Sequence, residues 1–254
     1  MTHLLTQTEM RLDIYLSDMG LASSRSEAKR LIDEGAVSVN GRVIMKPSCD
    51  VGDNDKINVE RGEMIYVSRG GIKLAGALDV FKINVNGREA IDVGASSGGF
   101  SDCLLKKGAK RVIAVDSGSA QLVSKLREDP RVISIENYNA RYINSADLPY
   151  LPDIAVMDVS FISATYIIPS LSRVLRDNAD FVCLIKPQFE VGRENVGKGG
   201  IVKDERARKR AVDRVVACAI ENGLSLREVI TSPIKGGDGN VEFLAHFVKD
   251  GKEL

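Results

Sequence analysis

Hydrophobic positions follow two different patterns along this chain, and the pattern changes between residues 61 and 68. After residue 88, short apolar runs alternate with longer segments in which apolar residues recur at helical spacing. Because strands that alternate with helices form parallel sheets, residues 69–254 are predicted to form an α/β domain with a doubly wound, mostly parallel sheet. The runs place its strands at residues 89–93, 111–116, 132–135, 154–158 and 181–186.

Further elements flank this alternating region. Residues 68–78 predict a helix opened by two glycines, and residues 204–222 predict a long helix. We expect helices also after the first, second and fourth strands. The runs at 224–231 and 241–248 alternate apolar and polar residues, so they predict an antiparallel pair that closes one edge of the sheet.

Residues 1–60 predict a separate, small α+β domain, and residues 61–68 a linker. Ser24 is a predicted N-cap, Glu27 completes a capping box, and Gly35 ends the same helix. Asn40-Gly41 is a hairpin-turn dipeptide between two short strands. The predicted elements are a helix from Arg11, a helix at 24–34, and strands at 36–39, 42–44 and 55–60.

Composition narrows the possible functions. The 254 residues carry 35 Lys and Arg against 35 Asp and Glu, so no overall field indicates a nucleic-acid partner and any such contact must be local. The four cysteines form no C-x-x-C pair and there are two histidines, which argues against a metal site or a disulfide framework. With neither a signal peptide nor a membrane-length apolar run, we expect a cytoplasmic protein without a membrane partner.

A glycine-rich turn follows the first predicted strand of the larger domain. Strand, turn and helix in this order are typical of a nucleotide-binding corner. Asp116 ends the next strand about 20 residues further along the sequence, the usual place of an acid that binds ribose hydroxyls. The spacing does not match the dinucleotide pattern G-x-G-x-x-G; it is usual in S-adenosylmethionine-dependent methyltransferases. A turn that merely packs a helix on a sheet would look similar. The candidate cofactor residues here are Asp92, Gly94, Ala95, Ser96, Gly98, Gly99 and Phe100.

Polar residues also stand at the carboxyl ends of the later strands, where α/β sheets bind their ligands. Lys186 ends an apolar strand, and burying its ammonium is unfavourable unless a carboxylate such as Asp158 pairs with it. The alternative is an ion pair without chemistry. Asn137 or Asn139 could reach an adenine or its ribose, and Asp158 also belongs to the expected cofactor site.

The small domain resembles the S-four-type RNA-binding module of a small-subunit ribosomal protein. The resemblance rests on residues 11–13, 24–29 and 35–41. It implies RNA binding, for which Arg11, Arg25, Lys29 and Arg30 are the candidate residues. Since residues 1–60 hold seven Lys and Arg against ten Asp and Glu, the resemblance supports this prediction more than the charge does.

The larger domain resembles the FtsJ-like ribose 2'-O-methyltransferases, and the two domains together resemble the TlyA (haemolysin A-type) ribosomal RNA methyltransferases. The motifs are 68–73, 157–163, 184–190, 197–202 and 239–243. The resemblance implies a Rossmann-like methyltransferase fold, S-adenosyl-L-methionine as cofactor, and ribosomal RNA or a ribosomal subunit as partner. It also implies a catalytic tetrad of Lys73, Asp158, Lys186 and Glu242.

These residue types suit the implied reaction. A ribose hydroxyl is a poor nucleophile near neutral pH, so a base must assist its deprotonation, and a desolvated Lys186 near Lys73 could be that base. Asp158 and Glu242 would hold the lysines. The alternatives are a non-catalytic RNA-binding or ribosome-assembly factor, a haemolysin-like activity, and a nicotinamide-dependent oxidoreductase, which the glycine spacing disfavours.

Overall fold

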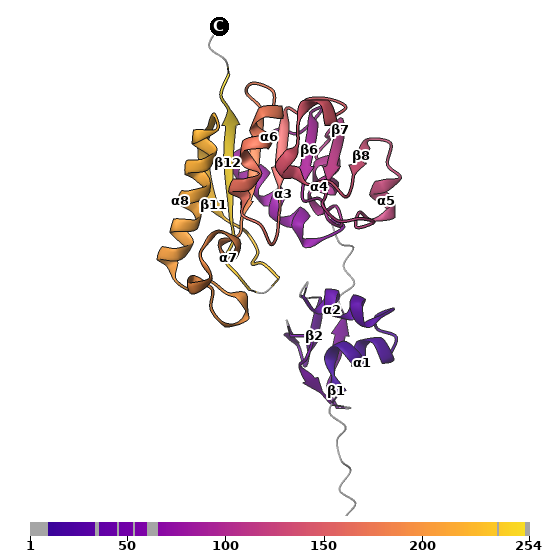
Figure 1. Cartoon of the computed structure of the whole chain (residues 1–254). Helices are drawn as coiled ribbons and strands as arrows, with labels where there is room; N and C mark the ends of the chain where they lie inside the picture. The colour runs from indigo at the N-terminus through magenta and orange to yellow at the C-terminus, as the bar shows by residue number, and fades with distance from the viewer. Residues whose placement is uncertain are drawn as a thin grey trace, which may run out of the picture. The chain divides into compact units, whose positions relative to one another are not determined.

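The computed structural model describes residues 10–33, 36–44, 46–52, 54–59, 66–237 and 239–251. The chain divides into two compact units, Met1–Met64 and Ile65–Leu254 (Figure 1). Of the predicted linker, residues 61–65 lie outside the described residues, and Tyr66 to Ser68 pack on the second unit. There the backbone N–H of Val67 donates to the Asp102 carboxylate at 3.0 Å.

The small unit packs two helices against two small sheets. Leu12, Leu16 and Ile32 on the helices are buried together with Val37 and Val51 on the strands. The helices are α1 (Leu12–Asp18) and α2 (Arg25–Asp33); the antiparallel sheets are β1 (Met10–Arg11) with β4 (Asp50–Val51), and β3 (Arg42–Val43), β2 (Val37–Val39) and β5 (Ile57–Val59) in that order. The β1–β4 pair is absent from the sequence prediction, because two-residue strands leave no alternating pattern.

Local sequence signals explain the turns of this unit. The Ser24 hydroxyl accepts from the Glu27 backbone N–H at 3.1 Å, as the capping box predicts. The Glu27 carboxylate, however, accepts from the backbone of Ser23 at 2.6 Å. Asn40 and Gly41 have φ of 52° and 79°, the left-handed conformation that a two-residue hairpin requires. The predicted helix end at Gly35 lies outside the described residues.

The second unit contains a seven-stranded sheet in the order β11-β12-β10-β9-β6-β7-β8. The five neighbouring strands from β10 to β8 in this order run parallel to one another. Strand β12 is antiparallel to both of its neighbours, β10 and β11. This confirms the predicted parallel sheet with an antiparallel closing pair. The strands are β6 (Glu89–Val93), β7 (Arg111–Val115), β8 (Val132–Ile135), β9 (Ile154–Met157), β10 (Asp180–Ile185), β11 (Leu224–Thr231) and β12 (Phe243–Lys249).

Helices cover both faces of this sheet (Figure 1). Helices α6 (Ile168–Val174) and α8 (Glu205–Glu221) pack on one face, and α3 (Arg69–Phe81), α4 (Gly99–Lys106) and α5 (Ser124–Arg127) pack on the other. The predicted helix after β7 is only partly correct, because α5 has 4 residues. The short helix α7 (Pro187–Glu190) follows β10, and 3-10 turns η1 (Ala140–Tyr142), η2 (Ser145–Asp147), η3 (Ala164–Tyr166), η4 (Arg193–Asn195) and η5 (Lys198–Gly200) lie in the connections.

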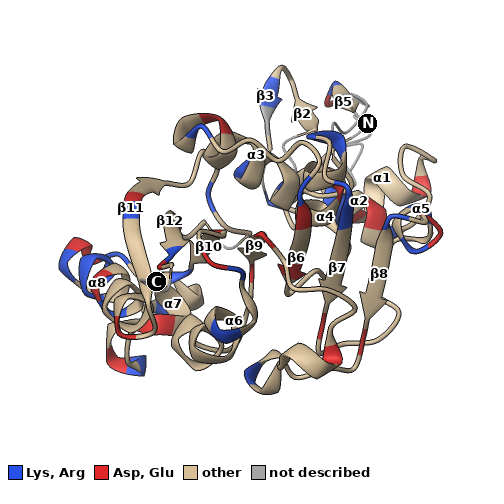
Figure 2. Ribbon diagram, turned by 90° about the horizontal axis from the view of Figure 1, so that it is seen from above, with Lys and Arg blue, Asp and Glu red and all other residues tan. Residues whose placement is uncertain are grey.

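Charged side chains are distributed without a single dominant sign. Figure 2 shows Lys and Arg interspersed with Asp and Glu along α8. In the part of the chain that is described, no helix combines the length and hydrophobicity needed to span a membrane, and no group of His, Cys, Asp and Glu could hold a metal ion.

Candidate active site

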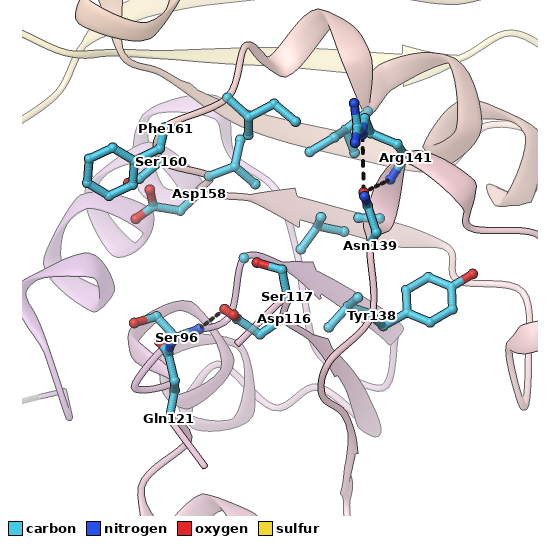
Figure 3. A pocket seen from close by; sticks show the side chains of 17 residues that line it. Ser96, Asp116, Ser117, Gln121, Tyr138, Asn139, Arg141, Asp158, Ser160 and Phe161 are labelled. Atoms are coloured by element: carbon cyan, nitrogen blue, oxygen red, sulfur yellow. Dashed lines mark hydrogen bonds between the residues drawn. The ribbon is translucent and has the colours of Figure 1, made fainter. Parts of the chain in front are cut away.

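A cavity of about 520 Å³ lies at the carboxyl ends of the parallel strands, within the size range of small-molecule sites (Figure 3). Its walls come from the ends of β6, β7 and β9 and from the segment after β8. The lining residues are Val93, Gly94, Ser96, Val115, Asp116, Ser117, Gln121, Tyr138, Asn139, Ala140, Arg141, Asp158, Val159, Ser160, Phe161, Ile162 and Ile167. This is the sheet edge that the sequence predicted as the ligand site.

Asp116 holds the turns on one side of this cavity. One carboxylate oxygen accepts from the backbone N–H of Ser96 and the other accepts from Gly118, both at 2.7 Å. Figure 3 shows the hydrogen bond between Ser96 and Asp116. Since each carboxylate oxygen has a second lone pair, Asp116 can still accept hydrogen bonds from a ligand.

Asp92, near the end of β6, does not line the cavity. Its side chain is fully buried, and one oxygen accepts from the Ser101 hydroxyl at 2.7 Å. The other oxygen has no partner among the described residues. Burial raises the pKa of Asp92 to about 7; the hydrogen bond from Ser101 opposes this shift, and the negative charges of Asp158 and Asp116 add to it.

The glycines of the turn are explained largely by contacts within the protein. A Cβ on Gly94 would lie 2.3 Å from the backbone oxygen of Asp158, and φ of 84° also favours glycine there. A Cβ on Gly98 would lie 2.2 Å from Leu126, and one on Gly99 would lie 2.1 Å from the Ser68 hydroxyl. Of these three glycines, Gly94 lines the cavity. The glycine pattern therefore reflects close packing as much as ligand approach.

Asn137 and Asn139 are separated by the structure. Asn139 lines the cavity, and its side-chain oxygen accepts from the backbone of Arg141 at 3.1 Å. Asn137 has φ of 55°, and its backbone donates to Gly118 at 2.9 Å; it does not line the cavity. Asn139 is thus the better placed of the two candidates.

A second, smaller cavity of about 170 Å³ adjoins the first. The two share Gly94, Ser96, Asp158 and Ser160 in their walls. The other residues of the smaller cavity are Ser68, Gly70, Lys73, Ala95, Ser97, Gly99, Phe100 and Lys186. A ligand group that extends from the larger cavity into the smaller one would therefore meet two lysines.

The predicted tetrad forms two ion pairs at the smaller cavity. Lys186 Nζ lies 2.6 Å from Asp158 Oδ1, and Lys73 Nζ lies 2.5 Å from Glu242 Oε2. Glu242 is 3% exposed and immediately precedes β12, the strand between β10 and the edge strand β11. The structure thus brings all four residues together, with each lysine held by one carboxylate.

Ser160 and Phe161 line the larger cavity but were not singled out by sequence reasoning. The Ser160 hydroxyl accepts from Lys186 Nζ at 2.7 Å. Phe161 is 92% exposed with φ of 64°, and its ring centroid lies 5.2 Å from that of Phe189. Both stand within the recognised motif after Asp158, but only the folded loop reveals what they contact.

Glu190 ties the loop after β9 to the helix after Lys186. Its carboxylate is buried and accepts from the Ser163 hydroxyl at 2.5 Å and from the Ala164 backbone at 2.7 Å. Burial raises the pKa of Glu190, and these two hydrogen bonds oppose that shift. The loop that carries Ser160 is therefore fixed by a buried acid.

In the small unit, the candidate RNA-binding arginines are held by an internal acid. Buried Asp13 accepts from Arg11 at 2.9 Å and from Arg25 at 3.2 Å. The hydrogen bond from Arg11 is the main reason that the pKa of Asp13 is lowered to about 2. Lys29 and Arg30 are exposed on α2, where Arg30 also lies 3.5 Å from Glu27.

Comparison with known proteins finds two family profiles in the chain. The profile of FtsJ-like methyltransferases matches residues 66–249, and that of the S4 domain matches residues 10–57. The two matches fall in the two compact units.

Relatives match over nearly the whole length. Hemolysin A of Brachyspira hyodysenteriae is 45% identical over 240 residues, 94% of this chain and 100% of that protein. The 16S/23S rRNA (cytidine-2'-O)-methyltransferase TlyA of Mycobacterium tuberculosis is 44% identical over 234 residues, 92% of this chain and 87% of that protein. The solved structure of a candidate hemolysin from Streptococcus thermophilus has a TM-score of 0.76 and 44% identity, covering 96% of this chain and 90% of that one.

Proposed function

The chain belongs to the FtsJ-like methyltransferase family and carries an S4 domain, and on this basis we propose that it methylates ribose 2'-hydroxyls of ribosomal RNA with S-adenosylmethionine. The observation that carries this proposal is the pair of lysine–carboxylate contacts in a small cavity that adjoins a ligand-sized one. Following the M. tuberculosis relative, we assign cytidine as the nucleotide that is modified.

The larger cavity fits the cofactor in size and in the polar groups that it offers. Asp116 would accept hydrogen bonds from the ribose hydroxyls, and Asn139 would contact the adenosine part. When bound, S-adenosylmethionine supplies a methyl group already activated by its sulfonium.

The protein's own residues then have two tasks, proton removal and alignment. Lys186, after its ammonium has lost a proton to solvent, takes the proton from the ribose 2'-hydroxyl, and Asp158 keeps the nitrogen beside both cavities. The Lys73–Glu242 pair places a second ammonium beside the developing negative charge on the oxygen. Alignment of the reacting atoms supplies much of the remaining acceleration.

Two further regions would contact the RNA. Phe161 is exposed at the rim of the larger cavity and offers an aromatic face on which an unstacked base can lie. In the S4 domain, Arg11, Arg25, Lys29 and Arg30 would contact phosphates. Asp13 fixes two of these arginines, so their guanidinium groups are ordered before RNA binds.

The test is transfer of labelled methyl groups onto purified small and large ribosomal subunits. We expect incorporation into a dinucleotide that resists alkaline hydrolysis, as a 2'-O-methyl group requires, and a loss of about 100-fold or more in Lys186→Ala. Lys209→Ala, on the exposed pair with Asp213, is the matched control and should retain activity.

Other results would contradict the proposal in different ways. Cofactor binding measured by calorimetry, without incorporation into either subunit, would identify a non-catalytic RNA-binding factor. Incorporation into a product that alkali cleaves normally would place the methyl group on a base.

A further inference from the structure

Lys186 contacts two oxygens that come from one short segment, a carboxylate oxygen at ion-pair distance and a hydroxyl that accepts a hydrogen bond. Its Nζ lies 2.6 Å from Asp158 Oδ1 and 2.7 Å from Ser160 Oγ. Asp158 and Ser160 both follow strand β9 and line both cavities, so Lys186 is fixed at the boundary between them. Only the Asp158 contact was expected from the sequence.

We propose that Ser160 is a positioning residue for the proposed methyl transfer: its hydroxyl is the second anchor that directs the free position of the Lys186 amine toward the ribose hydroxyl. The inference rests on the proposed function. A neutral amine has two N–H bonds and one lone pair in a tetrahedral arrangement. Among the described residues, Ser160 is the hydrogen-bond acceptor of this amine, whereas Asp158 Oδ1 contacts it as an ion-pair partner without hydrogen-bond geometry. Donation of one N–H bond to Ser160 leaves the lone pair two staggered positions about the Cε–Nζ bond; without this hydrogen bond all three positions are open.

The proton balance follows from this arrangement. The O–H bond of the ribose hydroxyl breaks and a third N–H bond forms on Lys186, which becomes an ammonium while the oxygen keeps the electron pair. The hydrogen bond to Ser160 and the contact with Asp158 need not break, because both oxygens can serve the amine and the ammonium alike. Proton transfer therefore requires no rearrangement around Lys186.

The loop that carries Ser160 is built to hold this position. Phe161, the next residue, has φ of 64°, a conformation that is unfavourable for a bulky side chain unless its surroundings impose it. Two residues further, Ser163 donates to buried Glu190 at 2.5 Å, and Glu190 also accepts from Ala164. Glu190 belongs to α7, the helix that begins directly after Lys186. Ser160 and Lys186 are thus linked in two ways, directly by their hydrogen bond and indirectly by the hydrogen bonds between the loop and Glu190.

Ser160 has no evident role in packing. It is exposed and lies outside the hydrophobic clusters of the described residues. Replacement by alanine therefore removes the hydroxyl and little else, which makes this position a clean test of the anchor.

The kinetic experiment compares Ser160→Ala and Ser160→Thr with the wild type on saturating ribosomal subunits and S-adenosylmethionine. We expect Ser160→Ala to lower kcat by about tenfold to hundredfold with both KM values unchanged, since misalignment of a reacting group costs rates of this order. Ser160→Thr keeps the hydroxyl and should recover most of the loss. Ser134→Ala, on the exposed side of β8, is the control and should match the wild type.

Two further comparisons separate positioning from a general structural effect. In a Lys186→Ala background, Ser160→Ala should cause no further loss, because the hydroxyl then has no amine to orient. Nitrogen-15 relaxation of Lys186 Nζ, assigned by its absence in Lys186→Ala, should show a mobile amine in Ser160→Ala and an ordered one in the wild type.

The relaxation measurement does not depend on methyl transfer. If the wild type methylates neither subunit while Ser160→Ala still increases the mobility of the Lys186 amine, the role of Ser160 in holding Lys186 is supported and the proposed function is wrong. An equally ordered Lys186 in Ser160→Ala, or an unchanged kcat in an active enzyme, would overturn the anchor.

Discussion

Asp92 shows how one buried side chain links this site to pH. Its carboxyl is fully buried and its pKa is raised to about 7. An unfolded aspartate releases its proton near its ordinary pKa of about 3.9, so between that value and about 7 the folded protein retains a proton that the unfolded chain has lost. The free energy of unfolding therefore falls as pH rises through this window.

Replacing Asp92 by asparagine should remove this dependence. Asp92→Asn keeps the shape of the side chain without a buried negative charge, so we expect a gain in unfolding free energy on the order of 4 kcal/mol at pH 8 and little gain at pH 4. Urea unfolding of wild type and variant at both pH values measures the difference. The control, Asp213→Asn on the exposed face of α8, should show no such pH-dependent gain. A gain of the same size at pH 4 and pH 8 would contradict the assignment.

The contacts of single residues also show what could and what could not be predicted from the sequence. Lys186 could be paired with Asp158 in advance, because adjacent parallel strands bring their carboxyl ends together. The Ser160 contact could not be foreseen, since it depends on a loop whose path includes a left-handed Phe161. Asp92 was expected to hold the cofactor directly, and its complete burial depends on helix α4 and Ser101 above it.

At the scale of elements, the connection between β11 and β12 positions Glu242. Within it, the backbone of Gly236 donates to Asn240 at 2.9 Å. The Asn240 side chain is buried; it accepts from Val202 at 3.0 Å and donates to Gly200 at 2.9 Å. A Cβ on Gly236 would lie 2.4 Å from Glu242 Oε1. The connection therefore leaves the Glu242 carboxylate no room to move toward Gly236.

Two neighbouring glycines of this connection offer a matched test. Gly236→Ala should displace the Glu242 carboxylate from Lys73 and lower kcat by about tenfold or more, although residue 236 lines neither cavity. Gly237→Ala is the control, because a Cβ there meets nothing within 4 Å. Methylation assays of both variants under saturating substrate decide the question. Equal activity in the two variants would show that the Glu242 position is not critical.

The positions of the strands in the sequence were predicted better than their order in the sheet. Strands β6, β7, β9 and β10 are apolar runs that both faces of the sheet bury, so their pattern alone identifies them. No single apolar run of the sequence determines the order of the strands in the sheet. Strand β12 follows directly after Glu242, and its position between β11 and β10 results from pairings between distant segments.

At the scale of the whole molecule, the expected RNA contact has to overcome an unfavourable charge balance. Residues 1–60 carry seven basic against ten acidic residues. Within the described part of this unit, Asp13 is buried between Arg11 and Arg25, while Lys29 is exposed on α2. RNA binding would therefore depend on a few basic side chains in fixed positions and not on a net positive charge of this unit.

Salt dependence measures such contacts directly. If Lys29 meets a phosphate, Lys29→Ala should weaken binding to ribosomal RNA and reduce the slope of log affinity against log salt concentration by about one. Fluorescence anisotropy with a labelled RNA fragment at several salt concentrations gives both quantities. Lys56→Ala, an exposed lysine outside α2, serves as the control. An unchanged slope in Lys29→Ala would remove this residue from the interface.

The position of β12 has a consequence for the order in which the molecule becomes competent. Ribosomes make a chain from its N-terminal end, and domains fold as units in that order. Glu242 follows Lys73, Asp158 and Lys186 in sequence, and β12 must enter between β10 and β11 before the sheet is complete. During synthesis, the S4 domain can thus fold long before the four residues of the proposed tetrad come together, and we expect a copy whose translation stops short of the last strand pair to be inactive from the start.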